Sequence, residues 1–374
     1  YYALYYAFYP LFPLGLVGIS LAGDLFSIWL FMEFLLIPSY FLIAYFGYVG
    51  RRKVALMAFL WGTTASSFFL AGALLVYADI GSFSLSHLPH LAGGKHAQLA
   101  CALMVLGLLI KMGVLGFHTW IPWVEGEPPT SIAGLLACYS SIGVYVLART
   151  LALPLPELLS PLSLPLMLWA LATMIYGALL TIAQHDIKRL YACSTISQTA
   201  YSLLGIASLT AMGVAGGIFY FLSHIIGKCI LFSVAGIILS QTGLRDMRMM
   251  GGLARKMPIT ATLCILGSMI LSAIPPLSGF QAEWIMFTGI FQQGIQGSPF
   301  NLAVAVVGIF ATFLTTVYTF WPVMKVFFGP LPETLREVEE APFTMTVPLL
   351  ILALTSFLFG VYPEFMMKFL SSTV

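Results

Sequence analysis

The chain is built of apolar stretches of about 20 residues that follow one another from residue 1 to residue 363. A helix of that length crosses a hydrocarbon core about 30 Å thick. Only 8% of the 374 residues are charged, 60% are hydrophobic, and the mean hydropathy is +0.98. A soluble domain carries about 25% charged residues. Since the stretches also lack the alternating pattern of a membrane barrel, the sequence predicts an all-α polytopic membrane protein.

Eleven transmembrane helices fit the chain, separated by short polar connections. They are predicted at residues 1–23, 25–48, 54–78, 97–122, 130–152, 164–184, 190–209, 212–240, 257–294, 299–328 and 343–363. Most basic residues lie after the even-numbered helices: Arg51, Arg52, Lys53, Lys188, Arg189, Arg245, Arg248, Arg255, Lys256, Lys325 and Arg336. The opposite connections hold Lys95, Arg149 and Lys368. Because cytoplasmic loops are rich in Lys and Arg, the first side is predicted to be cytoplasmic and the C-terminus non-cytoplasmic.

The fourth and ninth predicted helices carry signals for a break inside the membrane. Gly113 and Gly116 precede HTWIPW in the fourth, and AIPPLSGF at residues 273–280 interrupts the ninth. Unwound backbone persists in a membrane only where protein or a watery cavity satisfies it, and broken helices at corresponding positions mark transport sites. We therefore expect two inverted five-helix repeats. The predicted units are residues 1–152, residues 164–328, and a cytoplasmic loop with a last helix at 329–374.

Five ionisable residues remain deep inside the predicted helices: Glu33, Lys111, His224, Lys228 and Glu283. A charged side chain at the centre of a bilayer costs about 2.5–3.5 kcal/mol on insertion scales. That cost favours a functional role over a lipid-facing position. Structural ion pairs that tie helices together are the alternative for Glu33 and Lys111.

His224 and Lys228 lie four residues apart on one helical face, about 6 Å apart along the helix axis. Two basic groups so close disfavour each other's charged forms, and burial acts in the same direction. Lys228 is therefore better suited to releasing and taking up protons than to a fixed ion pair. For His224 alone, a hydrogen-bonded core histidine is an equal alternative.

Other polar residues have simpler interpretations. Asp24, Arg149 and Lys325 lie near helix ends, where snorkelling or lipid contact accounts for them. The five cysteines lie in apolar stretches without ligand spacing, and His87, His90 and His96 share a solvated loop. The sequence contains no phosphate loop, dinucleotide fingerprint or Ser-His-Asp arrangement. We therefore expect this chain to bind no cofactor and no metal.

Five segments together resemble the antiporter-like subunits of respiratory complex I, Mrp-type cation/proton antiporters and energy-converting hydrogenases. They are DLFSIWLFMEFLLIPSYFLIAYFG, LLIKMGVLGFHTWIPWVEGEPPTSIAGLL, AQHDIKRLYACSTISQTAYSLLGI, FYFLSHIIGKCILFSVAGII and IPPLSGFQAEW. Glu33 matches the glutamate of the family's fifth helix, and Lys111 matches the lysine of its broken seventh. His224 and Lys228 match the H-x-x-x-K pattern of the eleventh helix, and Glu283 matches the ionisable position of the twelfth.

The sequence departs from the family pattern in three ways. Family members usually have fourteen or more helices, so the resemblance implies that the first three are missing here. The eighth helix usually carries a lysine where SSIGVYVLAR has Ser141, and a serine holds water but stores no charge. Lys228 is typical of L-type, Mrp-type and hydrogenase-type subunits, and Glu283 of M-type and hydrogenase-type ones. This combination favours an M-type or hydrogenase-type subunit.

The resemblance and the buried residues predict a proton-translocating subunit of a complex I-like or energy-converting hydrogenase-like complex, with no redox site of its own. The predicted relay comprises Glu33, Lys111, His224, Lys228 and Glu283, with water held near Ser140, Ser141 and Tyr145. A subunit of an Mrp-type Na⁺/H⁺ antiporter without redox chemistry is the alternative. A structural scaffold that conducts nothing is a third interpretation.

The resemblance also implies partners and a location. The expected partners are other membrane subunits, including further antiporter-like subunits, together with peripheral redox subunits and lipid, but no nucleic acid. The expected location is the cytoplasmic membrane of a bacterium or archaeon.

Overall fold

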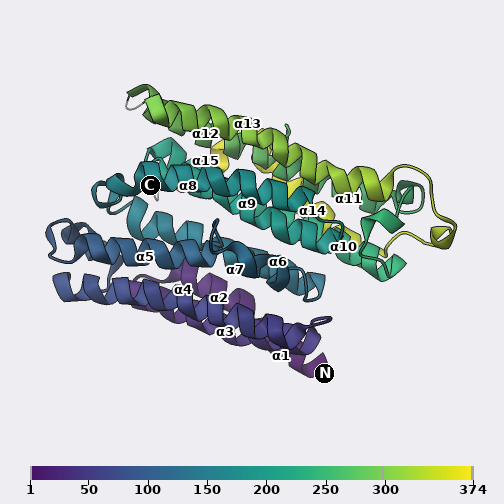
Figure 1. Cartoon of the computed structure of the whole chain (residues 1–374), viewed down its shortest axis with the longest axis horizontal. Helices are drawn as coiled ribbons and strands as arrows, with labels where there is room; N and C mark the ends of the chain where they lie inside the picture. The colour runs from purple at the N-terminus through teal and green to yellow at the C-terminus, as the bar shows by residue number, and fades with distance from the viewer. Residues whose placement is uncertain (1, 297–298, 372–374) are drawn as a thin grey trace.

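Long helices run side by side along the longest axis of the molecule (Figure 1). The computed structural model describes residues 2–296 and 299–371, so the predicted side of the C-terminus itself lies outside the described residues. α1 (Tyr2–Phe8) lies at one end of the bundle and α15 (Glu364–Ser371) at the other. Apart from two isolated β-bridges, the described residues form helices and connections. The predicted all-α architecture is confirmed.

Eight helical segments within the described residues are long and apolar enough to cross a membrane. They are α1 with α2 (Leu11–Leu21), α3 (Leu25–Phe46), α4 (Arg51–Ile80), α7 (Thr130–Leu147) with the π-helix η3 (Ala148–Ala152), α8 (Pro156–Ile182), α10 (Ala211–Thr242), α13 (Pro299–Pro322) with the π-helix η6 (Val323–Phe327), and α14 (Phe343–Val361). The other segments are α5 (Ala97–Met112) with α6 (Ile121–Val124), α9 (Ile187–Ala207), and α11 (Pro258–Leu271) with α12 (Ser278–Gln296). Together they correspond to the eleven predicted helices.

Both predicted breaks are present. α5 ends before Gly113, which has a φ of 61°, and α11 ends shortly before Ala273, which has a φ of 51°. Positive φ suits glycine and strains other residues, so this conformation at Ala273 marks a local constraint. α5 and α6 run along the bundle in one direction and α11 and α12 in the other (Figure 1).

Further features recur five membrane-crossing segments apart. Asp24 before α3 forms a β-bridge with Ser84, and Asp186 before α9 forms one with Asp246. A π-helix follows both α7 and α13. Because the paired segments run in opposite directions, these matches support the inverted five-helix repeat. The residue limits of its two halves stay a prediction.

Two boundaries differ from the prediction. α8 begins at Pro156 rather than at residue 164, with Pro161 and Pro165 inside it. Pro156 occupies the first helical position, where its missing N–H group breaks no helical hydrogen bond. α15 was not predicted, because it is short and begins just after Pro363.

Apolar side chains cover the outer face of the bundle. On α13, Phe310 and Phe313 are 73% and 71% exposed, as expected of residues that face lipid or another subunit. α9, by contrast, is buried along nearly its whole length and contacts α6, α7, α8, α10 and α12. Polar groups on α9 therefore have to find their partners inside the protein.

Close packing of α4 on α5 gives a test of the fold. A Cβ atom on Gly107 would lie 2.5 Å from the carbonyl oxygen of Ala65, so Gly107→Ala is expected to cost about 1–3 kcal/mol of stability. A Cβ on Gly93 meets nothing within 4 Å, which makes Gly93→Ala the control. Unfolding midpoints in detergent, followed by circular dichroism, check this. Equal midpoints for both variants would contradict the packing.

Candidate functional site

A stripe of polar side chains runs along the buried helix α9. Ser194, Thr195, Gln198, Thr199 and Tyr201 are all buried. Their spacing of three or four residues places them on one side of the helix. Buried polar groups need hydrogen-bond partners, and this stripe obtains them from neighbouring helices.

The first charged group on this path is Lys111, in the last turn of α5 and only 4% exposed. Its ammonium lies 3.5 Å from the ring centroid of Tyr139 on α7. Such a cation–π contact contributes about 0.5–2 kcal/mol, most when the cation is desolvated. The Tyr139 hydroxyl reaches α4, where it would lie 2.6 Å from a Cβ on Gly62.

Glu33 on α3 is the carboxylate whose charge acts on Lys111. Its Oε1 accepts a hydrogen bond from the Ser66 hydroxyl on α4. Glu33 and Lys111 are not among the ion pairs within 4.0 Å in the described part of the chain. The direct ion pair expected from the sequence is therefore replaced by a longer-range interaction, with the Tyr139 ring against the ammonium.

Lys228 on α10 forms the second charged group and is completely buried. Its ammonium donates to the Tyr191 carbonyl oxygen and, at 2.5 Å, to the Ser194 hydroxyl. His224, one turn earlier, is buried, and neither ring nitrogen has a hydrogen-bond partner among the described residues. His224 is thus a buried imidazole with both nitrogens available.

Glu125, which the sequence interpretation missed, lies beside this second group. It directly follows α6 and is 0% exposed. Its Oε1 accepts from the Ser140 hydroxyl at 2.9 Å and its Oε2 from the Thr195 hydroxyl at 2.6 Å. Lys228 is the positive charge that acts on it. The segment VEGEPP has the composition of a polar turn, and only its position directly after a broken helix signals a buried carboxylate.

Glu283 on α12 forms the third charged group and is 7% exposed. Thr312 on α13 donates to its Oε1, and its Oε2 has no partner within the described residues. The charge of Glu283 acts on Tyr201 and Tyr220. The path from α9 toward Glu283 is therefore polar.

Hydrogen bonds connect these tyrosines to α9 and α13. The Tyr220 hydroxyl donates to Gln198 at 2.8 Å, and the Gln198 amide donates to the Tyr318 hydroxyl at 2.7 Å. Tyr201 pairs with the Thr315 hydroxyl at 3.0 Å. This network extends the polar stripe from the surroundings of Lys228 to those of Glu283.

The three predicted water-path residues point to different places. Ser140 binds Glu125, and the Ser141 hydroxyl lies 3.0 Å from that of Thr199. The Tyr145 hydroxyl instead donates to the Ser20 carbonyl and accepts from Arg149. Tyr145 and Arg149 line a largely apolar cavity of about 620 Å³ between α2, α7 and α10. The two serines thus lie on the buried path, whereas the Tyr145 hydroxyl faces this cavity.

The remaining polar candidates have local roles. Asp24 accepts hydrogen bonds from the backbone and hydroxyl of Ser27 and caps α3. His96 pairs with Asp79 at 2.8 Å. In the described ranges, no three His, Cys, Asp or Glu side chains are grouped as metal ligands.

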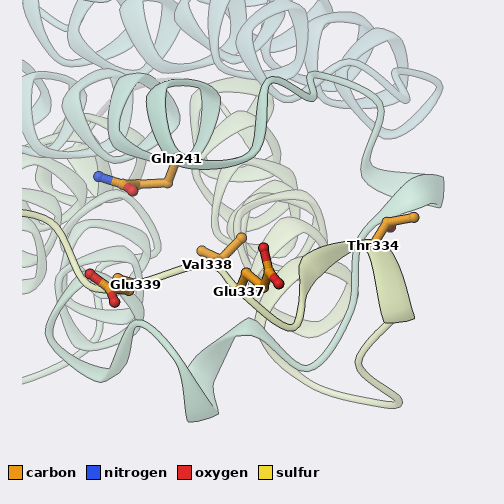
Figure 2. Close-up of a pocket in the computed structure, with 5 residues that line it drawn as sticks. All are labelled: Gln241, Thr334, Glu337, Val338 and Glu339. Atoms are coloured by element: carbon orange, nitrogen blue, oxygen red, sulfur yellow. The ribbon is translucent and has the colours of Figure 1, made fainter.

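A separate pocket of about 270 Å³ opens near the connection between α13 and α14. Figure 2 shows that its lining comes from two parts of the chain, with Gln241 on α10 facing the acidic connection. The lining residues are Gln241, Thr334, Glu337, Val338 and Glu339. They share no residue with the buried charged groups described above.

The family model described as NADH:quinone oxidoreductase/Mrp antiporter, TM, matches residues 22–315. This range includes the polar stripe and all the buried ionisable residues described above. The chain belongs to this family of membrane subunits.

Relatives and a solved structure agree with this assignment. NADH-quinone oxidoreductase subunit N of Desulforudis audaxviator is 31% identical, over 96% of this chain and 74% of the relative. A Na⁺/H⁺ antiporter subunit of Alkalihalophilus pseudofirmus is 29% identical, over 86% and 67%. Respiratory complex I from Thermus thermophilus with bound NADH contains a chain of 26% identity and TM-score 0.87, with 95% and 75% covered. The chain is thus an antiporter-like subunit of the kind found in complex I-like and Mrp-type complexes.

The contact between Lys111 and Tyr139 predicts unequal effects of two substitutions. Tyr139→Leu removes the ring and is expected to destabilise the protein by about 2 kcal/mol or more. Tyr139→Phe keeps the ring and loses only a hydroxyl that has no partner among the described residues, so its cost is expected to be below about 1 kcal/mol. Thermal unfolding in detergent measures both. A cost for Phe equal to that for Leu would contradict a role of the ring.

Proposed function

We propose that this chain translocates protons as a subunit of a complex I-like or energy-converting hydrogenase-like membrane complex. The observation that carries the proposal is the chain of buried ionisable groups distributed around α9, with polar partners between them. Family membership supports it. Redox energy released elsewhere in the complex drives the proton movement.

The first step concerns Glu33 and Lys111. A nearby carboxylate favours the charged form of a buried lysine, and its removal or neutralisation has the opposite effect. Glu33 is only partly buried, so a neighbouring subunit is able to change its surroundings. When Glu33 is neutralised or drawn away, Lys111 releases its proton from Nζ.

The following steps carry the proton past α9 to the far side of the chain. The hydroxyls of Ser140 and Ser141 orient water near α9. Lys228 takes up the proton, and His224 has both ring nitrogens available to pass it on. Glu283 is the final acceptor, next to Trp284, which is 65% exposed toward the outside of the bundle.

The proposed setting follows the charge distribution. The basic connections face the cytoplasm, since Lys and Arg are enriched on that side, and the C-terminus lies on the other side of a bacterial or archaeal cytoplasmic membrane. The proposed partners are further antiporter-like subunits beside α3 and α13, peripheral redox subunits and lipid. The exposed apolar side chains of α13 support a lateral membrane contact.

A second candidate is Na⁺/H⁺ exchange without redox chemistry. The similarity to a Na⁺/H⁺ antiporter subunit supports it. Proteins that co-purify with this chain separate the two candidates: redox subunits support the first, and Mrp-type subunits alone support the second.

Replacing Lys111 tests the proposed relay. Lys111→Met keeps a long apolar side chain but binds no proton, so proton translocation by the purified complex in liposomes is expected to fall on the order of a hundredfold. Lys325→Met is the matched control, because Lys325 is exposed near a helix end beside Trp321, and it is expected to pump like the wild type. Undiminished pumping by Lys111→Met would overturn the proposal.

A further inference from the structure

One buried carboxylate has no part in the relay described so far. Glu125 is 0% exposed, and hydroxyls from two different helices hold its two oxygens. Burial of a carboxylate is expensive unless it is paired and hydrogen-bonded. Such a group, directly after a break in a membrane helix, calls for a reason beyond packing.

Glu125 and Lys228 are coupled through adjacent residues of α9. Thr195 donates to the carboxylate at 2.6 Å, and Ser194 accepts from the Lys228 ammonium at 2.5 Å. Each of the two charges acts on the other. Two hydroxyls on consecutive residues thus lie between a carboxylate and an ammonium.

Glu125 is also coupled to the Lys111 group, through consecutive residues of α7. Tyr139 contacts the Lys111 ammonium with its ring, and Ser140 donates to Glu125 at 2.9 Å. Ser141 does not take part in this contact, because its hydroxyl pairs with Thr199. The carboxylate therefore lies between the two lysine groups, where Ser141 stores no charge.

We propose that Glu125 is the proton-carrying group between Lys111 and Lys228, and this inference rests on the proposed function. A lysine ammonium loses one proton and becomes a neutral amine, while a carboxylate oxygen of Glu125 gains that proton and becomes neutral. The reverse step returns the carboxylate and charges the second lysine. The sum of the charges stays constant throughout, and the step needs no further reactant.

The hydroxyls around Glu125 are suited to both states. An ionised carboxylate only accepts hydrogen bonds, whereas a protonated one also donates. Ser140 and Thr195 both donate to the carboxylate in the structure, and either hydroxyl is able to turn and accept once its oxygen is protonated. A fixed structural ion pair needs no such reversible partners.

Substitution of Glu125 tests the inference in the assembled complex. Glu125→Gln preserves size and hydrogen bonding but binds no proton, so proton translocation is expected to fall on the order of a hundredfold. Glu125→Asp keeps the carboxyl and is expected to retain a larger part of the wild-type rate. Glu127→Gln is the matched control, two residues further along, partly exposed and coupled instead to Arg245 and Lys188. Complex yield and redox activity report on folding.

Infrared difference spectroscopy of the same samples gives a readout independent of pumping. A carbonyl band of a protonated carboxylic acid that changes during turnover, is lost in Glu125→Gln and persists in Glu127→Gln supports the inference. Wild-type pumping by Glu125→Gln, or a spectrum identical to that of the wild type, would overturn it. If the wild type moves no protons, the proposed function fails, and the infrared band still decides whether Glu125 exchanges a proton.

Discussion

The cost of holding a charge away from water governs this structure. An isolated ammonium or carboxylate in a low-dielectric interior is very unfavourable, and a bilayer offers no water to relieve it. The chain meets this cost with α9, a buried helix whose polar side chains and carbonyl groups serve as partners for other helices. Lys228 uses the Tyr191 carbonyl and Ser194, and Glu125 uses Thr195. The broken helices next to α9 bring these groups to it.

The same constraint explains why the buried charges suit proton movement. Each group has partners sufficient to keep it inside, yet the charges interact through hydroxyls and rings rather than through tight ion pairs. Lys111 rests against Tyr139 instead of a carboxylate, and one oxygen of Glu283 has no partner in the described ranges. Small changes in a neighbour's charge therefore alter which form of each group is favoured.

Much of the fold and part of the site could be predicted from the sequence, because they depend on local signals. A lysine in an apolar run identified Lys111, and glycine and proline identified the two breaks. Glu125 could not be predicted in this way, since a polar Gly-Pro segment looks like an exposed turn and its burial depends on the packing of α6 against α9. The direction of the Tyr145 hydroxyl likewise depends on α2, which lies far from it in the sequence.

The central claim is that the buried groups around α9 carry protons. The most direct measurement records the pH inside liposomes that contain the purified complex, with a pH-sensitive dye, as redox turnover begins in Na⁺-free and Na⁺-containing buffer. The account predicts the same rate of pH change in both buffers, abolished by a protonophore. No pH change, or a change that requires Na⁺, would contradict it.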